Sequence, residues 1–183
     1  KFLIAFFIYS SALQTVLIIA TYFGEQEIAW KEGTKTTGLI ISILLIQLIA
    51  IIGAMFTAKI SKKIGNIRTL LILNLIWAFL CIGAYFIKEP IEFYIAAGAV
   101  GLVMGGIQAL SRSTFSKLIP DTDNTTSYFS FFDVSQKVSI VLGMTLFAIL
   151  DQTTGSMRIS ILIFVLIFLI GAFLLNKIKI KNV

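Results

Sequence analysis

The chain has 183 residues, of which 58% are hydrophobic and 13% are charged, and its mean hydropathy is +0.98. This composition excludes an ordinary soluble domain, in which roughly 45–50% of residues are apolar and about 25% are charged. The net charge of +6 and the single cysteine, Cys81, indicate neither a nucleic-acid-binding module nor a disulfide framework, and the absence of histidine argues against histidine-based catalysis and metal sites. We therefore expect no enzyme, no cofactor and no bound metal.

Long apolar segments follow one another along the chain. Each has about 20 residues or more, the length that a helix needs to cross an apolar bilayer core of ~30 Å. A β-barrel would instead show alternating segments of ~10 residues. The sequence thus predicts an all-α membrane protein with six transmembrane helices, at residues 2–23, 38–58, 68–87, 91–115, 127–150 and 157–176.

The basic residues are distributed unevenly between the two sides of these predicted helices. Ten of the 15 lie on the side of Lys1, four lie on the opposite side, and Lys137 lies inside a span. Because cytoplasmic segments are enriched in lysine and arginine, this bias predicts that both termini are cytoplasmic. The chain begins without methionine or a polar leader, so we expect it to be a piece of a longer protein.

The first predicted helix carries polar residues near its middle, among them Ser11 and Gln14 on one face. An amide group is costly in lipid, so Gln14 should face protein or water. A hydrogen bond between helices and a place along a solute path both satisfy this requirement.

The fourth predicted helix has a stripe of Gly101, Gly105, Gln108 and Arg112, which share one face. Glycines spaced i, i+4 allow another helix to approach closely. The glycines are therefore expected to serve packing. For Gln108 and Arg112 the alternatives are packing or topology on the one hand and the lining of a cavity on the other.

The fifth predicted helix contains Asp133 and Lys137 at i, i+4, where they can pair directly. Gly143 lies in a second stripe with Gln136 and Ser139 and is expected to serve helix packing. The charged residues are either a self-neutralised pair that fixes the rotation of the helix, or residues that face a water-filled path. Charges inside membrane spans mark substrate or ion routes by default.

The run "GLVMGGIQALSRSTFSKLIP" (residues 101–120) resembles a signature of the vacuole-effluxer-like permeases, a branch of the major facilitator superfamily that includes a fungal autophagy-related amino-acid effluxer. The segments "FFIYSSALQTV" and "FSFFDVSQKVSIVLG" resemble the seventh and eleventh helices of that branch. The resemblance implies that residues 1–183 are one domain, corresponding to helices seven to twelve of a twelve-helix transporter. It also implies two inverted three-helix repeats, at residues 2–87 and 91–176.

The segment "AKISKKIGNIR" resembles the cytoplasmic loop motif of the superfamily, G-x-L-A-D-R-x-G-R-K-R. Lys63, Gly65 and Arg68 match the motif, whereas Lys62 stands where it has an aspartate and Ala58 replaces its first glycine. The resemblance therefore implies a cytoplasmic gating loop, and these two departures weaken the expectation of a charge relay through it.

By this resemblance, the chain is half of a secondary transporter that moves a small solute, amino acid-like substrates included, by alternating access. The implied solute path holds Ser11, Gln14, Gln108 and Arg112, and Asp133 and Lys137 are implied to border the other half as a coupling pair. The expected partners are the lipid bilayer, the solute, and the N-terminal half or a second copy, in a bacterial inner membrane. The alternative is a separate six-helix protein that forms a homodimeric carrier or channel.

Overall fold

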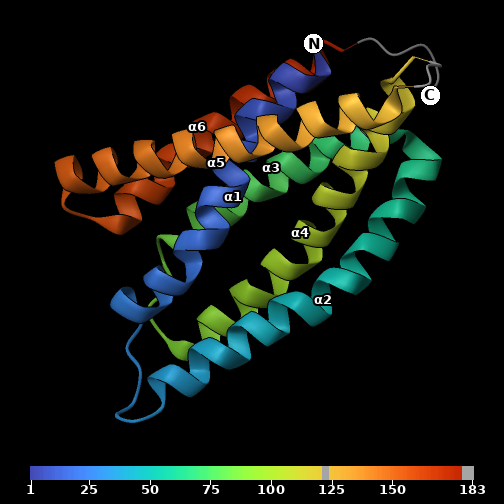
Figure 1. The fold of residues 1–183 in the computed structure, drawn as a ribbon. Coiled ribbons are helices and arrows are strands. Elements are labelled where there is room, and N and C mark those ends of the chain that lie inside the picture. Colours follow the sequence, from blue (N-terminus) through green and yellow to red (C-terminus); the bar gives the residue numbers. More distant parts are fainter. Residues whose placement is uncertain (121–123, 179–183) are drawn as a thin grey trace.

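The computed structural model describes residues 1–120 and 124–178, and within these ranges the secondary structure is entirely helical (Figure 1). Each helix is long and apolar enough to cross a membrane, so the predicted fold class, an all-α membrane protein with six spanning helices, is confirmed. The helices are α1 (Phe2–Glu27), α2 (Lys35–Ile64), α3 (Asn66–Ala84), α4 (Pro90–Leu118), α5 (Thr125–Thr154) and α6 (Met157–Asn176).

The helix boundaries depart from the predicted spans in a systematic way. Helices α1, α2, α4 and α5 extend beyond their spans at one or both ends, because helical structure continues past the apolar run that defines a span. Helix α3 ends three residues earlier than predicted, at Ala84. Helix α4 begins with Pro90 at its first turn, and the Glu89 and Glu92 side chains form a capping box there.

The predicted gating loop between the second and third helices is not a loop. Lys62 and Lys63 lie in the last turn of α2, Arg68 lies in the first turns of α3, and only Gly65 separates the two helices. Gly65 has φ 90° and ψ 153°, and its amide donates to the Ser61 carbonyl oxygen at 2.9 Å. One glycine thus makes the whole reversal, and the two lysines also stabilise the carbonyl end of α2 through the helix dipole.

Substitution of Gly65 by alanine is expected to destabilise this junction without any steric clash. A Cβ there would meet nothing within 4 Å, so the cost arises from the backbone conformation alone, φ 90° with ψ 153°, which is nearly restricted to glycine and costs other residues about 1–2 kcal/mol. We expect the melting temperature of the detergent-solubilised protein to fall by about 2–8 °C. Gly83→Ala is the matched control, because its Cβ also meets nothing within 4 Å and its φ is not positive. An unchanged melting temperature for Gly65→Ala would contradict this reading.

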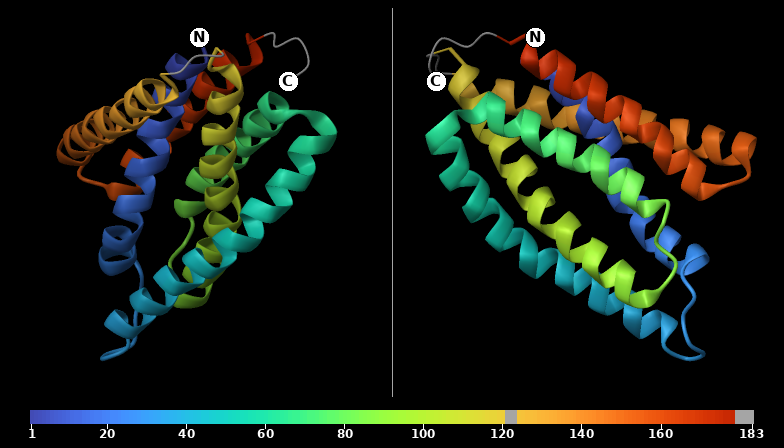
Figure 2. Two further views of the ribbon diagram at one scale, coloured as in Figure 1. Left: turned by 45° about the vertical axis from the view of Figure 1, so that its right-hand side comes forward. Right: turned by 180° about the vertical axis from the view of Figure 1, so that it is seen from behind.

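The six helices form two layers. Helix α2 packs along α4, α5 packs along α1, and α3 packs against α6 and α4. Figures 1 and 2 show α1, α2, α4 and α5 on one face of the bundle, with α3 and α6 behind them. The rear layer holds part of the core, where the rings of Trp77 and Phe168 stack at 5.7 Å and both side chains are fully buried.

Helices α2 and α5 bury little of their surface within the chain. The buried residues of α2 are small (Gly38, Ser42, Gly53, Thr57 and Ser61), and those of α5 are Phe132, Ser139, Gly143 and Phe147. Their remaining faces expose leucine, isoleucine, valine and phenylalanine side chains. In an aqueous protein such surfaces would be unstable, whereas lipid or further helices can cover them in a membrane.

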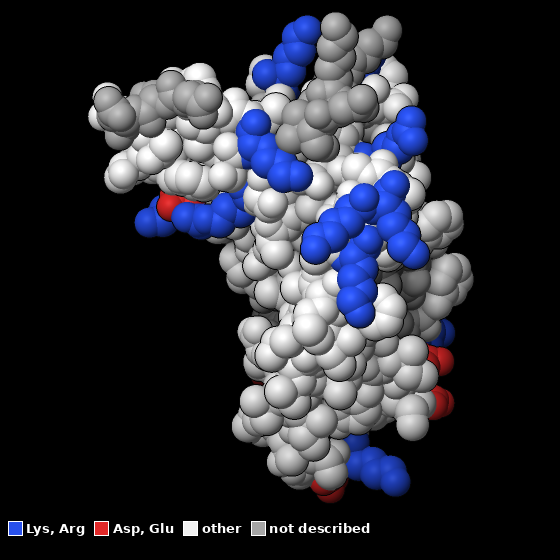
Figure 3. Space-filling model, turned by 90° about the vertical axis from the view of Figure 1, so that its right-hand side faces the viewer, with Lys and Arg blue, Asp and Glu red and all other residues white. Residues whose placement is uncertain are grey.

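The charged residues lie mainly at the ends of the bundle. Figure 3 shows most lysine and arginine side chains toward one end, with an uncharged belt below them. This basic end consists of the start of α1, the α2–α3 junction and the ends of α4 and α6, and α5 begins there. Its basic residues include Lys59, Lys62, Lys63, Arg68 and Lys117.

A candidate solute path between α1 and α4

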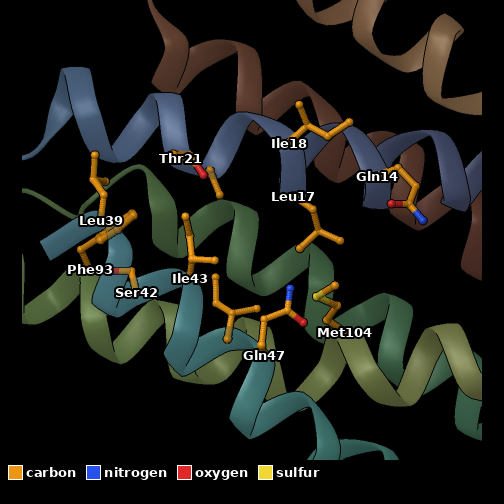
Figure 4. Close-up of a pocket in the computed structure, with 12 residues that line it drawn as sticks. Gln14, Leu17, Ile18, Thr21, Leu39, Ser42, Ile43, Gln47, Phe93 and Met104 are labelled. Carbon is orange, nitrogen blue, oxygen red and sulfur yellow. The ribbon is translucent and has the colours of Figure 1, made fainter. Parts of the chain in front are cut away.

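Two cavities flank the line along which α1 faces α4. The first has a volume of about 260 Å³ and lies between α1, α2 and α4. Its polar lining residues are Gln14, Thr21, Ser42 and Gln47, and its other lining residues are apolar. Figure 4 shows Gln14 on one wall, with Gln47 and Met104 on the other. The cavity is uncharged and amphipathic, and it suits the apolar body of a small solute with one or two hydrogen-bonding groups.

The second cavity has a volume of about 280 Å³ and lies between α1, α4 and α5. It is more polar, because its walls include side chains of the following residues: Tyr9, Ser10, Gln108, Ser111, Arg112 and Gln136. The Tyr9 hydroxyl is 2.7 Å from the Ser111 hydroxyl, a buried hydrogen bond that links α1 to α4. The Ser139 hydroxyl donates to that of Ser10 at 3.2 Å and links α5 to α1.

The structure divides the four residues predicted for the solute path. Gln14 lines the first cavity, whereas Gln108 and Arg112 line the second. Ser11 is among the lining residues of neither cavity, and its hydroxyl donates to the Ile8 carbonyl oxygen at 2.7 Å. The reason is geometric: Ser11 lies where α1 contacts Gly143 of α5, so close packing occupies the space beside it.

Asp133 pairs with a residue that the sequence analysis did not assign to it. Its Oδ1 accepts a hydrogen bond from Nη1 of Arg112 at 3.3 Å, which joins α5 to α4. A pair within α5 between Asp133 and Lys137, one of the two alternatives, is not among the salt bridges of the described residues, because α4 brings Arg112 to the carboxylate from the side. Both side chains of the observed pair are about half exposed, so the bond is accessible and contributes little to stability by itself.

Aromatic side chains surround this ion pair at the basic end. The Arg112 guanidinium lies 5.3 Å from the centre of the Phe129 ring. The Phe132 ring stacks on Phe6 of α1 at 4.1 Å and on Phe115 of α4 at 4.8 Å. Since Phe6 and Phe132 also line the second cavity, an apolar wall across three helices borders the polar groups there.

The glycines predicted to serve packing lie at close helix contacts. A Cβ on Gly101 would lie 2.7 Å from the Ile46 carbonyl oxygen, and one on Gly105 would collide with the Ala50 carbonyl oxygen. Gly143 is equally close to the backbone of α1 at Ser11. These residues hold α2 against α4 and α5 against α1, and thereby place the walls of the two cavities.

The sequence analysis missed Arg158, which it counted only as a charge on one side of the membrane. At the end of the bundle opposite the basic end, Arg158 Nε is 2.6 Å from Glu27 Oε2, Nη1 donates to the Tyr85 carbonyl oxygen at 2.7 Å, and Nη2 donates to the Glu27 carbonyl oxygen at 3.1 Å. The guanidinium also lies 5.4 Å from the Phe23 ring. The sequence did contain one signal for this site, since Arg158 is a lone cation at the start of a very apolar helix.

The described residues contain no group of three histidine, cysteine, aspartate or glutamate side chains that could hold a metal ion. The two cavities present amide, hydroxyl and guanidinium groups, which can form hydrogen bonds and pair with charge. Such groups can bind and release a solute.

Comparison with known proteins gives similarity over nearly the whole chain. It is 29% identical over 95% of its length to an MFS-type transporter of Bacillus subtilis that is named YxiO and described as uncharacterised. It is 32% identical over 87% of its length to autophagy-related protein 22 of Eremothecium gossypii, and 31% identical over 99% to the protein of that name from Saccharomyces cerevisiae. The chain spans 39%, 32% and 35%, respectively, of the lengths of these relatives.

A family of transporters accounts for both the six apolar helices and the relatives. The family described as "Vacuole effluxer Atg22 like" matches residues 1–182, with helices α1 to α6 inside the matched region. The similarity that the sequence analysis stated on the run of residues 101–120 is thus confirmed, and the chain belongs to the vacuole effluxer Atg22-like family of membrane transporters.

Proposed function

We propose that this chain forms one half of a secondary transporter that moves a small solute by alternating access. The observation that carries the proposal is the pair of cavities beside α1 and α4, one amphipathic and one more polar, with walls from α1, α2, α4 and α5. Figures 1 and 2 show these four helices in the layer opposite α3 and α6. Transporters of this type bind solute near the bilayer midplane and rock two units around it. Membership of the family supports the same function.

The packing supports two inverted repeats, at residues 2–87 and 91–176. The second helix of each repeat packs along the first helix of the other, since α2 lies on α4 and α5 lies on α1. The third helices, α3 and α6, pack against each other behind them. A two-fold relation between the repeats generates this exchange of partners.

A second six-helix unit completes the transporter in this proposal. The apolar faces of α2 and α5 are its contact surface, because these two helices bury the least surface within the chain. The relatives are long enough to contain such a unit. A second copy of this chain on the same faces is the alternative, and the molar mass of the purified parent protein distinguishes the two. We also propose a cytoplasmic position for the basic end and a bacterial inner membrane for the protein, and the bias of basic residues supports the orientation.

The two cavities have different tasks in this mechanism. Gln14 holds hydrogen-bonding groups of an amino acid-like solute in the uncharged cavity. Gln108 and Arg112 bind its polar end in the second cavity, and the bond from Arg112 to Asp133 opens when an anionic group competes for the guanidinium. Exchange of partners at an exposed ion pair supplies two discrete states, as alternating access requires.

Transport by the intact parent protein in vesicles tests this function. We would screen amino acids with and without a pH gradient and compare wild type with Arg112→Gln. Loss of the guanidinium removes both the anion contact and the Asp133 pair, so we expect transport to fall about tenfold or more, which corresponds to about 1.4 kcal/mol or more. Lys117→Gln, in an exposed lysine of the same helix end, is the control and should transport normally. Wild-type transport by Arg112→Gln would contradict the proposed path.

A further inference from the structure

Lys137 is a cation near the midpoint of α5 without a counter-charge in the described part of the chain. Its side chain is exposed, and the salt bridges of the described residues are Glu25–Lys35, Arg112–Asp133 and Glu27–Arg158. The carboxylate one turn away, Asp133, already accepts from Arg112. Lys137 therefore has neither the burial nor the partner that would explain a charge at this position.

The position of Lys137 along α5 places its amine deep in the membrane. Helix α5 has 30 residues and runs from Thr125 to Thr154. Lys137 is about 2.5 residues, or about 4 Å, from its midpoint at 1.5 Å per residue. If the helix is centred in an apolar core of ~30 Å, the Cα atom of Lys137 lies at least about 11 Å from either boundary of that core, whatever the tilt of the helix. A lysine stem extends only about 6 Å and does not reach the lipid headgroups from there.

The surroundings of Lys137 show which side of α5 must meet the missing charge. The buried residues Phe132, Ser139 and Gly143 mark the face of α5 that packs within the chain. Val134, Val138 and Val141 are exposed with Lys137, so apolar side chains flank the cation on the side away from the Arg112–Asp133 pair. Figures 1 and 2 show α5 in the layer opposite α3 and α6, the layer against which the proposed second unit packs.

We propose that Lys137 forms an ion pair, inside the membrane, with an aspartate or glutamate of the second six-helix unit of the parent protein. The inference rests on the proposed function for the existence of that unit. A carboxylate is the required chemistry, because an isolated charge is costly in the apolar core unless an opposite charge lies beside it. Lipid phosphates are out of reach by the distance argument above. The ion pair fixes the register of the two units along α5.

Thermal stability of the detergent-solubilised parent protein tests the pair independently of transport. Lys137→Glu would place two carboxylates together, so we expect its melting temperature to fall by about 5 °C or more. Lys137→Arg keeps the charge and should stay within about 2 °C of wild type. Lys117→Glu makes the same change of charge at the exposed end of α4 and should have a smaller effect, at most about 3 °C, that arises from the helix dipole.

A charge exchange then identifies the partner. In the Lys137→Glu background, each aspartate and glutamate in the apolar spans of the rest of the parent protein is changed to lysine, one at a time. We expect one of these changes to restore most of the lost melting temperature while lowering it in the wild-type background. Restoration by one such change supports the pair.

Two outcomes would overturn the proposal. One is a wild-type melting temperature for Lys137→Glu, which together with loss of transport would assign the cation to the solute. The other is the absence of any restoring charge exchange. Failure of wild-type protein to transport any solute would instead count against the proposed function, and the charge exchange would still decide the role of Lys137.

Discussion

Replacement of Gly105 by leucine is expected to be among the most disruptive single changes in this chain. Gly105 lies where α4 crosses α2, and even a Cβ would collide with the Ala50 carbonyl oxygen and would lie 2.8 Å from the Ala50 carbonyl carbon. These are backbone atoms, which cannot rotate away as a side chain can, so α2 must move as a whole. The change should cost about 3 kcal/mol or more, and it should reduce the yield of monodisperse protein after detergent extraction severely.

Two further variants separate packing from other effects of Gly105→Leu. Gly83→Leu introduces the same side chain into a helix where a Cβ meets nothing within 4 Å, and it should leave the yield unchanged. Gly101→Ala adds only one carbon, 2.7 Å from the Ile46 carbonyl oxygen, and should give an intermediate effect. If Gly105→Leu is extracted as well as wild type, α2 and α4 do not pack as the structure describes.

The close helix contacts at Gly105 and Gly143 also explain how the two cavities are positioned. Gly105 brings α2 against α4 beside the first cavity, and Gly143 brings α5 against α1 beside the second. In a membrane, apolar side chains gain little by leaving lipid for a protein interior, so close backbone approach at small residues determines which helices pair. The cavities remain where α1 and α4 have no comparable contact with each other.

The positions of the helices were predictable because hydropathy and length depend on sequence neighbours alone. Residues 157–176 coincide with the observed α6, since residues 161–175 are an uninterrupted apolar run that ends just before Lys177. The junction at Gly65 was harder to predict. The basic residues around it resemble a loop motif, yet they have good helix propensity, and only the glycine departs from helical backbone.

The grouping of side chains from different helices could not be obtained from the sequence. The i, i+4 rule paired Asp133 with Lys137, but it describes one helix and is blind to Arg112, which reaches Asp133 from α4. Similarly, a helical wheel placed Ser11 and Gln14 on one face of α1. The neighbours of that face are different helices at different heights, so Gln14 lines a cavity while Ser11 lies against α5.

Arg158 shows most clearly that patterns within one helix cannot predict contacts between helices, because its partners come from the ends of two other helices. The groups that accept hydrogen bonds from its guanidinium belong to Glu27, at the end of α1, and Tyr85, just after α3, and not to its own helix, α6. Its side chain is only 16% exposed and that of Glu27 only 27%. A charge pair in this setting is expensive to break, since the remaining partner is left in a poorly solvated site.

Arg158→Met is accordingly expected to destabilise the protein by about 3 kcal/mol. The change leaves the Glu27 carboxylate and two carbonyl oxygens without their donor, while the stem of the side chain keeps its apolar packing. We expect the melting temperature to fall by about 6–12 °C. Arg68→Met, at an exposed arginine of α3, is the control and should shift it little.

The double variant Arg158→Met, Glu27→Gln separates the cost of an unpaired charge from that of lost hydrogen bonds. Because the neutral amide needs no counter-charge, the double variant should recover part of the stability that the single variant loses. Additive losses would show that the two side chains do not interact. Coupling between them would show that this ion pair holds the ends of α1, α3 and α6 together at this end of the bundle.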